Sequence, residues 1–127
     1  MGVYTFEQLQ RASDRELEEI LRAGKSPNFA DMEGWEFKGF NTPPWARLLG
    51  IQRFKKGFFK RGTLAFGYNI PVDQRAPAGT WTCKPSDAAP KRFGFYEETP
   101  ADSRYPHALL LDYGLGGNGL RPEGLLR

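Results

Sequence analysis

The chain has 127 residues, with 18 Lys and Arg against 15 Asp and Glu and a formal net charge of +3. This length allows a single domain, residues 1–127, that buries a core without disulfide bonds. The one cysteine, Cys83, excludes an internal disulfide, and the one histidine, His107, excludes a multi-histidine metal site. We therefore expect no metal and no cofactor. Apolar stretches are too short to span a membrane and the N-terminus lacks a signal-peptide pattern, which predicts a cytoplasmic protein.

The N-terminal segment 5–24 is predicted to be helical. Thr5 and Ser13 are each followed three residues later by Gln or Glu, the pattern of a capping box. The second box is expected to start a new helix or mark a bend. An apolar stripe at helical spacing follows it, formed by Leu17, Ile20 and Leu21. Gly24 stands where a left-handed residue would end the helix.

Residues 33–113 show sequence patterns that are typical of β-strands. A short helix interrupts it at 43–50, with Thr42 as its predicted N-cap and Gly50 as its end. We expect a turn at Arg61 and Gly62 and about six strands, near 35–40, 52–60, 63–71, 80–83, 92–97 and 108–113. Turn-rich connections without crossover helices favour an antiparallel sheet that curls on itself, a mainly β fold with an N-terminal helix. Glycines inside the strands are expected to mark bulges or close approaches, at Gly39, Gly57, Gly67 and Gly94.

Charge is unevenly distributed along the chain. Residues 1–36 carry eight acids and four bases, whereas residues 37–72 carry seven bases and no acid. Within the basic middle, strand 53–61 interleaves aromatic rings with the bases Arg53, Lys55, Lys56, Lys60 and Arg61. Bases beside stackable rings are typical of a surface for single-stranded nucleic acid. The alternative interpretation is a strand whose charges face solvent while its aromatics pack inward.

Motifs that could carry catalysis lack the context they need. Residues 114–119 match G-x-G-x-x-G after a strand, but no βαβ unit can follow, so we predict a glycine-rich tail over 114–127. Cys83 and His107 could form a nucleophile and base pair, yet Cys83 is expected to be a small buried residue of a strand. Glu97 and Glu98 are adjacent in a strand and point to opposite faces. We therefore predict no catalytic residues.

Aromatic residues are the most prominent remaining feature. Most of these rings could simply fill a core that has few Val and Ile. They could instead line a barrel interior that holds a small apolar ligand. The predicted ligand-binding residues are Trp35, Phe37, Phe66, Tyr68, Trp81, Phe93, Phe95 and Tyr113.

Several motifs resemble a known family. They are Glu33-Gly34-Trp35-Glu36-Phe37-Lys38-Gly39 after a helical N-terminus, the Pro-Pro-Trp-Ala-Arg-Leu-Leu-Gly helix, and Leu111-Asp112-Tyr113 in a late strand. They resemble the lipocalin-like (calycin) proteins and the bacterial GXWXG group, although Gly34 and Trp35 are adjacent rather than separated by one residue. The resemblance implies a lipocalin-like barrel and the binding of a small apolar ligand without catalysis.

About six strands are too few to close an eight-stranded barrel. We therefore expect a barrel that is incomplete or partly open, or a chain that is part of a longer protein. An open edge would favour a homodimer or the addition of a partner strand. The leading hypothesis is non-enzymatic binding of a small apolar ligand. The alternative is an interaction module that uses strand 53–61 to bind single-stranded nucleic acid or an acidic protein.

Overall fold

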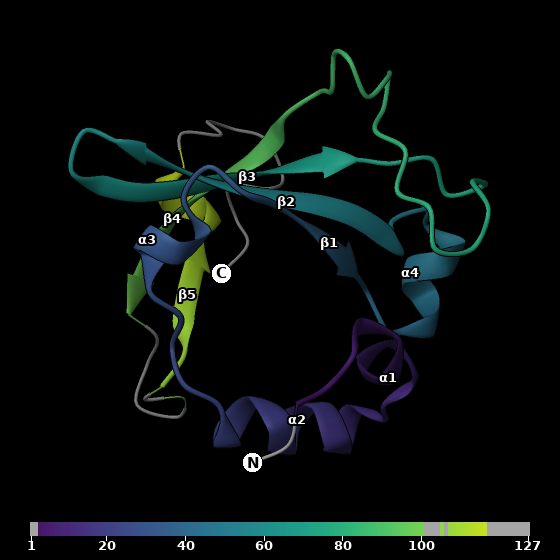
Figure 1. Ribbon diagram of the computed structural model, residues 1–127, viewed down its shortest axis with the longest axis horizontal. Helices are drawn as coiled ribbons and strands as arrows, with labels where there is room; N and C mark the ends of the chain where they lie inside the picture. Colours follow the sequence, from purple (N-terminus) through teal and green to yellow (C-terminus); the bar gives the residue numbers. More distant parts are fainter. Residues whose placement is uncertain (1–2, 101–104, 106, 117–127) are drawn as a thin grey trace.

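A computed structural model describes residues 3–100, 105 and 107–116. Its centre is one antiparallel sheet of five strands in the order β1-β2-β3-β4-β5 (Figure 1). The strands are β1 (Glu36–Phe40), β2 (Arg53–Arg61), β3 (Leu64–Pro71), β4 (Phe93–Pro100) and β5 (Leu109–Asp112). The helices are α1 (Phe6–Arg11), α2 (Asp14–Ala23), α3 (Phe29–Met32), α4 (Pro44–Leu48) and the 3-10 helix η1 (Tyr113–Leu115).

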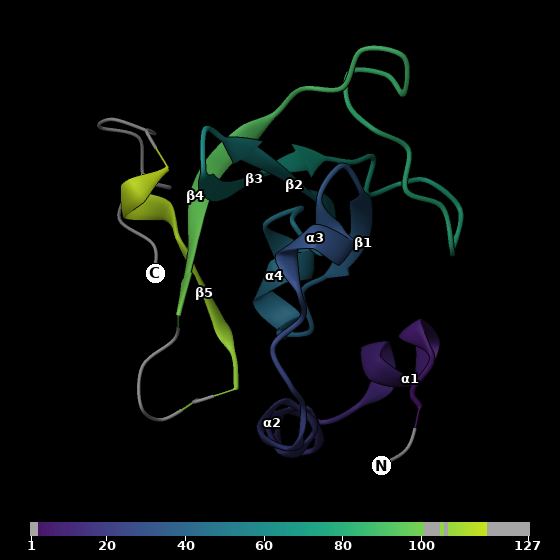
Figure 2. The ribbon, with the colours of Figure 1, turned by 60° about the vertical axis from the view of Figure 1, so that its left-hand side comes forward.

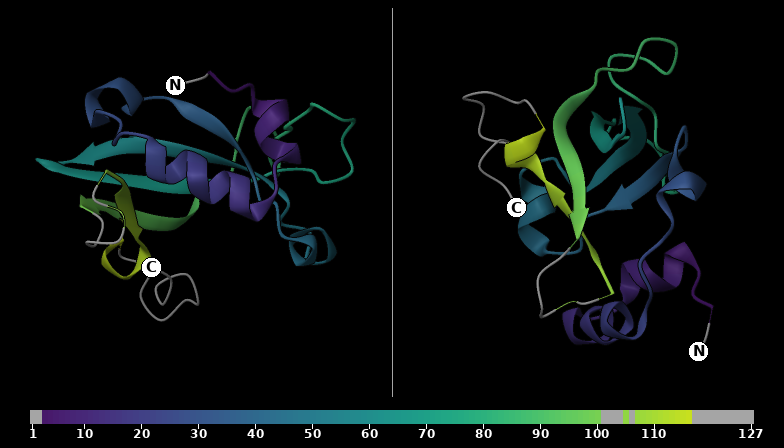
Figure 3. Two further views of the ribbon diagram at one scale, coloured as in Figure 1. Left: turned by 90° about the horizontal axis from the view of Figure 1, so that it is seen from below. Right: turned by 90° about the vertical axis from the view of Figure 1, so that its left-hand side faces the viewer.

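The sheet curls into a half-barrel. Figures 1 and 2 show α1 and α2 across from β2 and β3, and Figure 3 shows α2 running along the length of that hairpin. The Tyr105 hydroxyl donates to Glu18 of α2 at 3.0 Å, and the ring of Phe6 in α1 meets Trp81 edge-on at 5.5 Å. The prediction of a mainly antiparallel β fold is confirmed, with five strands rather than six among the described residues.

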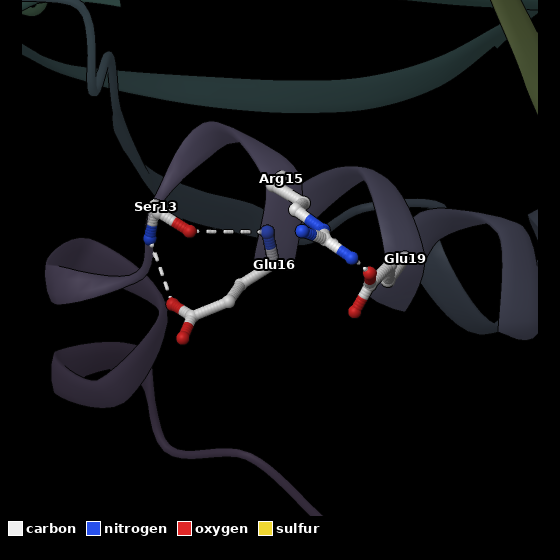
Figure 4. A network of polar contacts seen from close by, with 4 residues as sticks. All are labelled: Ser13, Arg15, Glu16 and Glu19. Atoms are coloured by element: carbon white, nitrogen blue, oxygen red, sulfur yellow. Dashed lines mark hydrogen bonds and ion pairs between the residues drawn. The ribbon is translucent and has the colours of Figure 1, made fainter.

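Both predicted capping boxes form, and each begins a separate helix. The Ser13 hydroxyl accepts from the amide of Glu16 at 3.2 Å, while the Glu16 carboxylate accepts from the Ser13 amide at 2.8 Å (Figure 4). These bonds satisfy amides at the start of α2 that have no partner within the helix. The prediction of a left-handed Gly24 is wrong. Its backbone is extended, with φ −78° and ψ 178°, and its amide donates to the Leu21 carbonyl at 3.3 Å, which closes the last turn without a left-handed residue.

Two further expectations need correction. The short helix α4 begins one residue later than predicted, with Pro43 rather than Thr42 as its N-cap, because Pro44 takes the first helical position where no amide is needed. The strand expected at 80–83 is reduced to a single bridge between Val72 and Cys83. Two backbone bonds of 2.9 Å flank this bridge, from the Asp73 amide to the Thr82 carbonyl and from the Lys84 amide to the Pro71 carbonyl, and Pro71 has no amide to return the second.

Strand register assigns side chains to two faces, which we call the Tyr68 face and the Tyr96 face. Gly57 pairs with Tyr68, and Gly67 pairs with Tyr96. A Cβ on Gly57 would lie 2.3 Å from the Tyr68 ring, and one on Gly67 would lie 2.2 Å from the Tyr96 ring. A Cβ on Gly39 would likewise overlap the ring of Phe54. The expectation that strand glycines mark close approaches is therefore confirmed, and aromatic rings cover the space that these glycines leave open.

A bulge in β4 changes which face its aromatics occupy. The pairing between β3 and β4 shifts register between Gly67 and Asn69, where Gly94 has φ +55°. Phe93 consequently pairs with Asn69 on the Tyr96 face, while Phe95 packs against Phe59 and Tyr68 on the other face. Without a bulge, residues two apart in a strand share one face.

The buried core lies mainly on the Tyr68 face. Tyr68, Ile70 and Cys83 form a buried cluster, against which Phe59 and Phe95 pack. Arg92 stacks over the Tyr68 ring at 4.2 Å, and the Tyr68 hydroxyl donates to Glu36 at 2.8 Å across the sheet. The segment that carries Val72 and Cys83 completes this cluster. The Tyr96 face is therefore left with a smaller set of packed rings.

Candidate functional site

A cavity of about 540 Å³ opens on the Tyr96 face near the start of β2. It is bounded by α4 and the turn after it, by the end of β3, by the start of β4 and by η1. Its apolar walls are formed by Trp45, Ile51, Phe54, Pro71, Val72 and Phe93. This volume falls in the range of small-molecule pockets, which are mostly apolar with few polar groups.

Lys56 is the main polar group of this cavity. Its Nζ donates to Asn69 Oδ1 at 2.8 Å and to the Tyr113 hydroxyl at 2.9 Å. Asn69 is buried and anchors the arrangement, because its Nδ2 donates to the Gly94 carbonyl at 2.9 Å and to the Tyr113 hydroxyl at 3.0 Å. The amine of Lys56, which β2 carries, is thus held by one residue of β3 and one of η1.

Three rings surround the Lys56 amine. Its Nζ lies 4.5 Å from the centre of the Tyr96 ring, 5.5 Å from that of Tyr113 and 5.6 Å from that of Phe54. Burial lowers the pKa of Lys56, and the neighbouring Tyr113 hydroxyl opposes part of that change. Within the described ranges, no Asp or Glu oxygen lies within 4.0 Å of this amine. The cation is therefore stabilised by rings and hydrogen bonds rather than by a carboxylate.

The other charged groups that line the cavity are also basic. Arg53 donates from one guanidinium nitrogen to the carbonyls of Ala76, Pro77 and Thr80 at 2.9–3.3 Å, which ties its side chain to this loop. Lys84 is exposed and lines the same cavity. No described Asp or Glu contributes to the lining. The described charged lining of the cavity is therefore basic, which favours an anionic group.

The predicted aromatic residues divide into three groups. Phe93 and Tyr113 line the cavity. Phe66, Tyr68 and Trp81 are buried, and Phe95 packs beside Tyr68, so these four belong to the core of the other face. Trp35 and Phe37 lie at the edge of the sheet and are 66% and 41% exposed.

The basic strand does not present one continuous surface. Register places Lys56 and Lys60 on the Tyr96 face and the other three bases on the Tyr68 face. Arg53 is held by the loop carbonyls, and Arg61 stacks over the Phe66 ring at 4.3 Å. Lys60 lies 3.9 Å from Glu33, an exposed pair. The alternation within the strand separates bases that are adjacent in sequence.

Sequence reasoning missed Trp45, Ile51 and Asn69 as cavity residues. Asn69 carried a usable signal, because it is the one amide in the apolar run of β3 and a buried amide needs partners. Trp45 and Ile51 gave no such signal, since their position depends on how α4 packs against the sheet. A larger hollow of about 680 Å³ lies between α1 and α2, but neither helix contains a buried residue. It therefore lacks buried polar groups like those that converge in the Lys56 cavity.

Catalytic groups do not converge in the part of the chain that the structure covers. Burial raises the pKa of the Cys83 thiol, while the Cys83 amide holds the pKa of the Asp87 carboxyl below its usual value. His107 is exposed, and the tail after Gly116 lies outside the described residues. No described group of three His, Cys, Asp or Glu side chains could hold a metal ion.

No described helix has the length and apolar character needed to cross a bilayer.

Comparison with known proteins adds no family to this description: no family model, curated protein or solved structure matches the chain.

Proposed function

We propose that this protein binds a small amphipathic molecule, with an apolar body and an anionic head, in the Lys56 cavity. The observation that carries the proposal is the lining: six apolar side chains surround a space of about 540 Å³, and the charged groups that the described residues contribute to it are bases. An apolar body would replace water along the walls, a gain that grows with the apolar area covered. The resemblance to lipocalin-like proteins implies a small apolar ligand, which agrees with the apolar body of this molecule.

An anionic head would supply a negative counter-charge for the Lys56 amine. The amine has two neutral acceptors, Asn69 and Tyr113, and no described carboxylate beside it. A partly buried cation gains most from a counter-charge placed in the same low-dielectric surroundings. A carboxylate, sulfonate or phosphate at this point would form a charge-assisted hydrogen bond. Lys84 lies at the lining as a second, exposed donor.

A fluorescence titration with dansyl-labelled undecanoic acid tests this proposal. We expect saturable binding of one probe per chain. Decanoic acid should displace the probe at lower concentration than decanol, and decylamine should be the weakest competitor because it brings a like charge. Absence of saturable binding, or equal competition by decylamine and decanoic acid, would contradict the proposal.

Lys56→Met provides the matched variant, because methionine keeps an unbranched side chain of similar length and removes the charge. Losing a charge-assisted hydrogen bond worth about 1.5–3 kcal/mol should weaken decanoic acid binding about 10- to 100-fold. Decanol binding should change much less. Lys60→Met is the control, since Lys60 is exposed on the same face of the same strand. An equal loss in both variants would show that total charge, rather than the cavity, determines binding.

Nucleic-acid binding by strand 53–61 stays a prediction without support from the geometry. Its bases are distributed over two faces, and Arg53 and Lys56 are engaged within the protein. A phosphate backbone would need a continuous basic track on one face.

A further inference from the structure

Four large apolar side chains are exposed within seven residues at α4 and the turn that follows. Leu48 is 88% exposed and Leu49 68%, while Trp45 and Ile51 are 54% and 45% exposed. We call this set, Trp45, Leu48, Leu49 and Ile51, the α4 patch. Exposed apolar groups scattered singly are normal in folded proteins, but a contiguous group indicates an interaction surface.

The local fold presents the α4 patch outward. Trp45, Leu48 and Leu49 have the i, i+3, i+4 spacing that places side chains on one side of a helix. Ala46 lies on another side of the helix and is fully buried against the rest of the protein. The Ile51 amide donates to the Ala46 carbonyl at 3.0 Å, and Gly50 has φ +68°, so the chain turns back directly after the helix. The turn therefore brings Ile51 beside the helix while leaving the leucines exposed.

The surroundings of the α4 patch are basic. Arg47 lies on α4 itself and is exposed, and residues 37–72 contain no acidic residue. Exposed Lys84 lines the same cavity as Trp45 and Ile51, and its carbonyl accepts from the amide of Lys91, another exposed base. Apolar side chains with tryptophan, bordered by Lys and Arg, match the interface of a membrane that carries anionic lipids.

We propose that the α4 patch docks this protein onto the surface of an anionic lipid bilayer. The apolar side chains enter the boundary between headgroups and acyl chains, and the neighbouring bases contact the headgroups. Two residues of the patch, Trp45 and Ile51, also line the Lys56 cavity. If the proposed ligand binding holds, docking would place the cavity against the bilayer, where an amphipathic molecule could enter. The docking itself does not depend on that ligand.

Co-sedimentation with ligand-free vesicles tests the docking separately from ligand binding. One vesicle preparation contains phosphatidylcholine alone, and the other contains phosphatidylcholine with phosphatidylglycerol. We expect binding to the anionic vesicles that weakens at high salt, because exposed charges are screened. We expect weaker binding to the neutral vesicles. Failure to bind the anionic vesicles would overturn the docking proposal and leave the fluorescence test of ligand binding unaffected.

The double variant Leu48→Ser and Leu49→Ser removes the most exposed part of the patch. Losing the burial of two leucines should weaken vesicle binding at least about tenfold. Leu64→Ser is the matched control, because Leu64 is 50% exposed at the start of β3, outside the patch. Equal vesicle binding by the double variant and the wild type would overturn the proposal. A dimer in sedimentation velocity that the double variant dissociates, together with no vesicle binding, would assign the patch to a second copy of the chain instead.

Discussion

Gly67→Ala is the substitution whose effect follows most directly from the packing of the sheet. A Cβ at this position would lie 2.2 Å from Cζ and from the hydroxyl oxygen of Tyr96. Tyr96 is fully buried, and its hydroxyl donates to the Gly57 carbonyl at 3.0 Å. The ring therefore has no free space to move into without breaking that hydrogen bond or disturbing Phe58, whose ring meets it edge-on at 5.9 Å.

The expected cost combines two terms. Forcing an extra methyl group into a packed core costs about 1–3 kcal/mol, and losing one intramolecular hydrogen bond costs about 1 kcal/mol more. We expect Gly67→Ala to lower the free energy of unfolding by about 2–4 kcal/mol. Gly24→Ala is the control, because its new Cβ would make only ordinary contacts at 3.4 Å. That variant should stay within about 0.5 kcal/mol of the wild type.

Urea unfolding followed by circular dichroism gives these free energies. A double-mutant cycle with Tyr96→Ala separates the steric clash from other effects. Tyr96→Ala alone should cost about 3–5 kcal/mol because a large buried ring is lost. Adding Gly67→Ala to it should cost much less than Gly67→Ala alone, since the ring that clashes is absent. Additive costs in the double variant, or a Gly67→Ala protein as stable as the wild type, would refute the reasoning.

Three further predictions concern the helix cap, the core tyrosine and the thiol. Ser13→Ala should destabilise the protein by about 1 kcal/mol, measured by urea unfolding, and Arg15→Ala by much less because its ion pair with Glu19 is exposed. Burial and the Glu36 carboxylate raise the pKa of Tyr68 to about 12, so the folded state retains a proton that the unfolded state loses. Unfolding measured from pH 9 to 12 should show stability falling above pH 10, less steeply in Tyr68→Phe. The buried Cys83 thiol should react with a thiol reagent at least about tenfold faster in urea than in buffer; equal rates would contradict its burial.

Sequence reasoning succeeded where structure depends on neighbouring residues. The caps at Thr5 and Ser13 need only a partner three residues away, and both formed as predicted. The β2–β3 hairpin needs two alternating runs and a glycine between them. Its turn lies at Gly62 and Thr63, one residue later than predicted.

Errors arose where distant residues decide the local structure. Sequence reasoning named Gly94 among the glycines that mark bulges or close approaches, but the face that each of Phe93 and Phe95 occupies depends on the pairing of β4 with β3. The same holds for Lys56, which the charge pattern grouped with four other bases. Its burial depends on Asn69 and Tyr113, which are 13 and 57 residues away in the chain. The cavity could not be predicted from sequence because it requires α4, β3 and η1 to be placed together.

The strand order β1-β2-β3-β4-β5 also has a consequence for how the chain folds. Each strand pairs with its neighbours in sequence, so the sheet can grow outward from the tight β2–β3 hairpin without any strand crossing another. Pairing between strands that are neighbours in sequence shortens the loops that must close, which favours faster folding. The slowest pairing is expected to be that of β4 with β3, because the connection 72–92 must close first and loop-closure entropy rises with its length. The closure of this connection is therefore expected to limit the rate at which the sheet is completed.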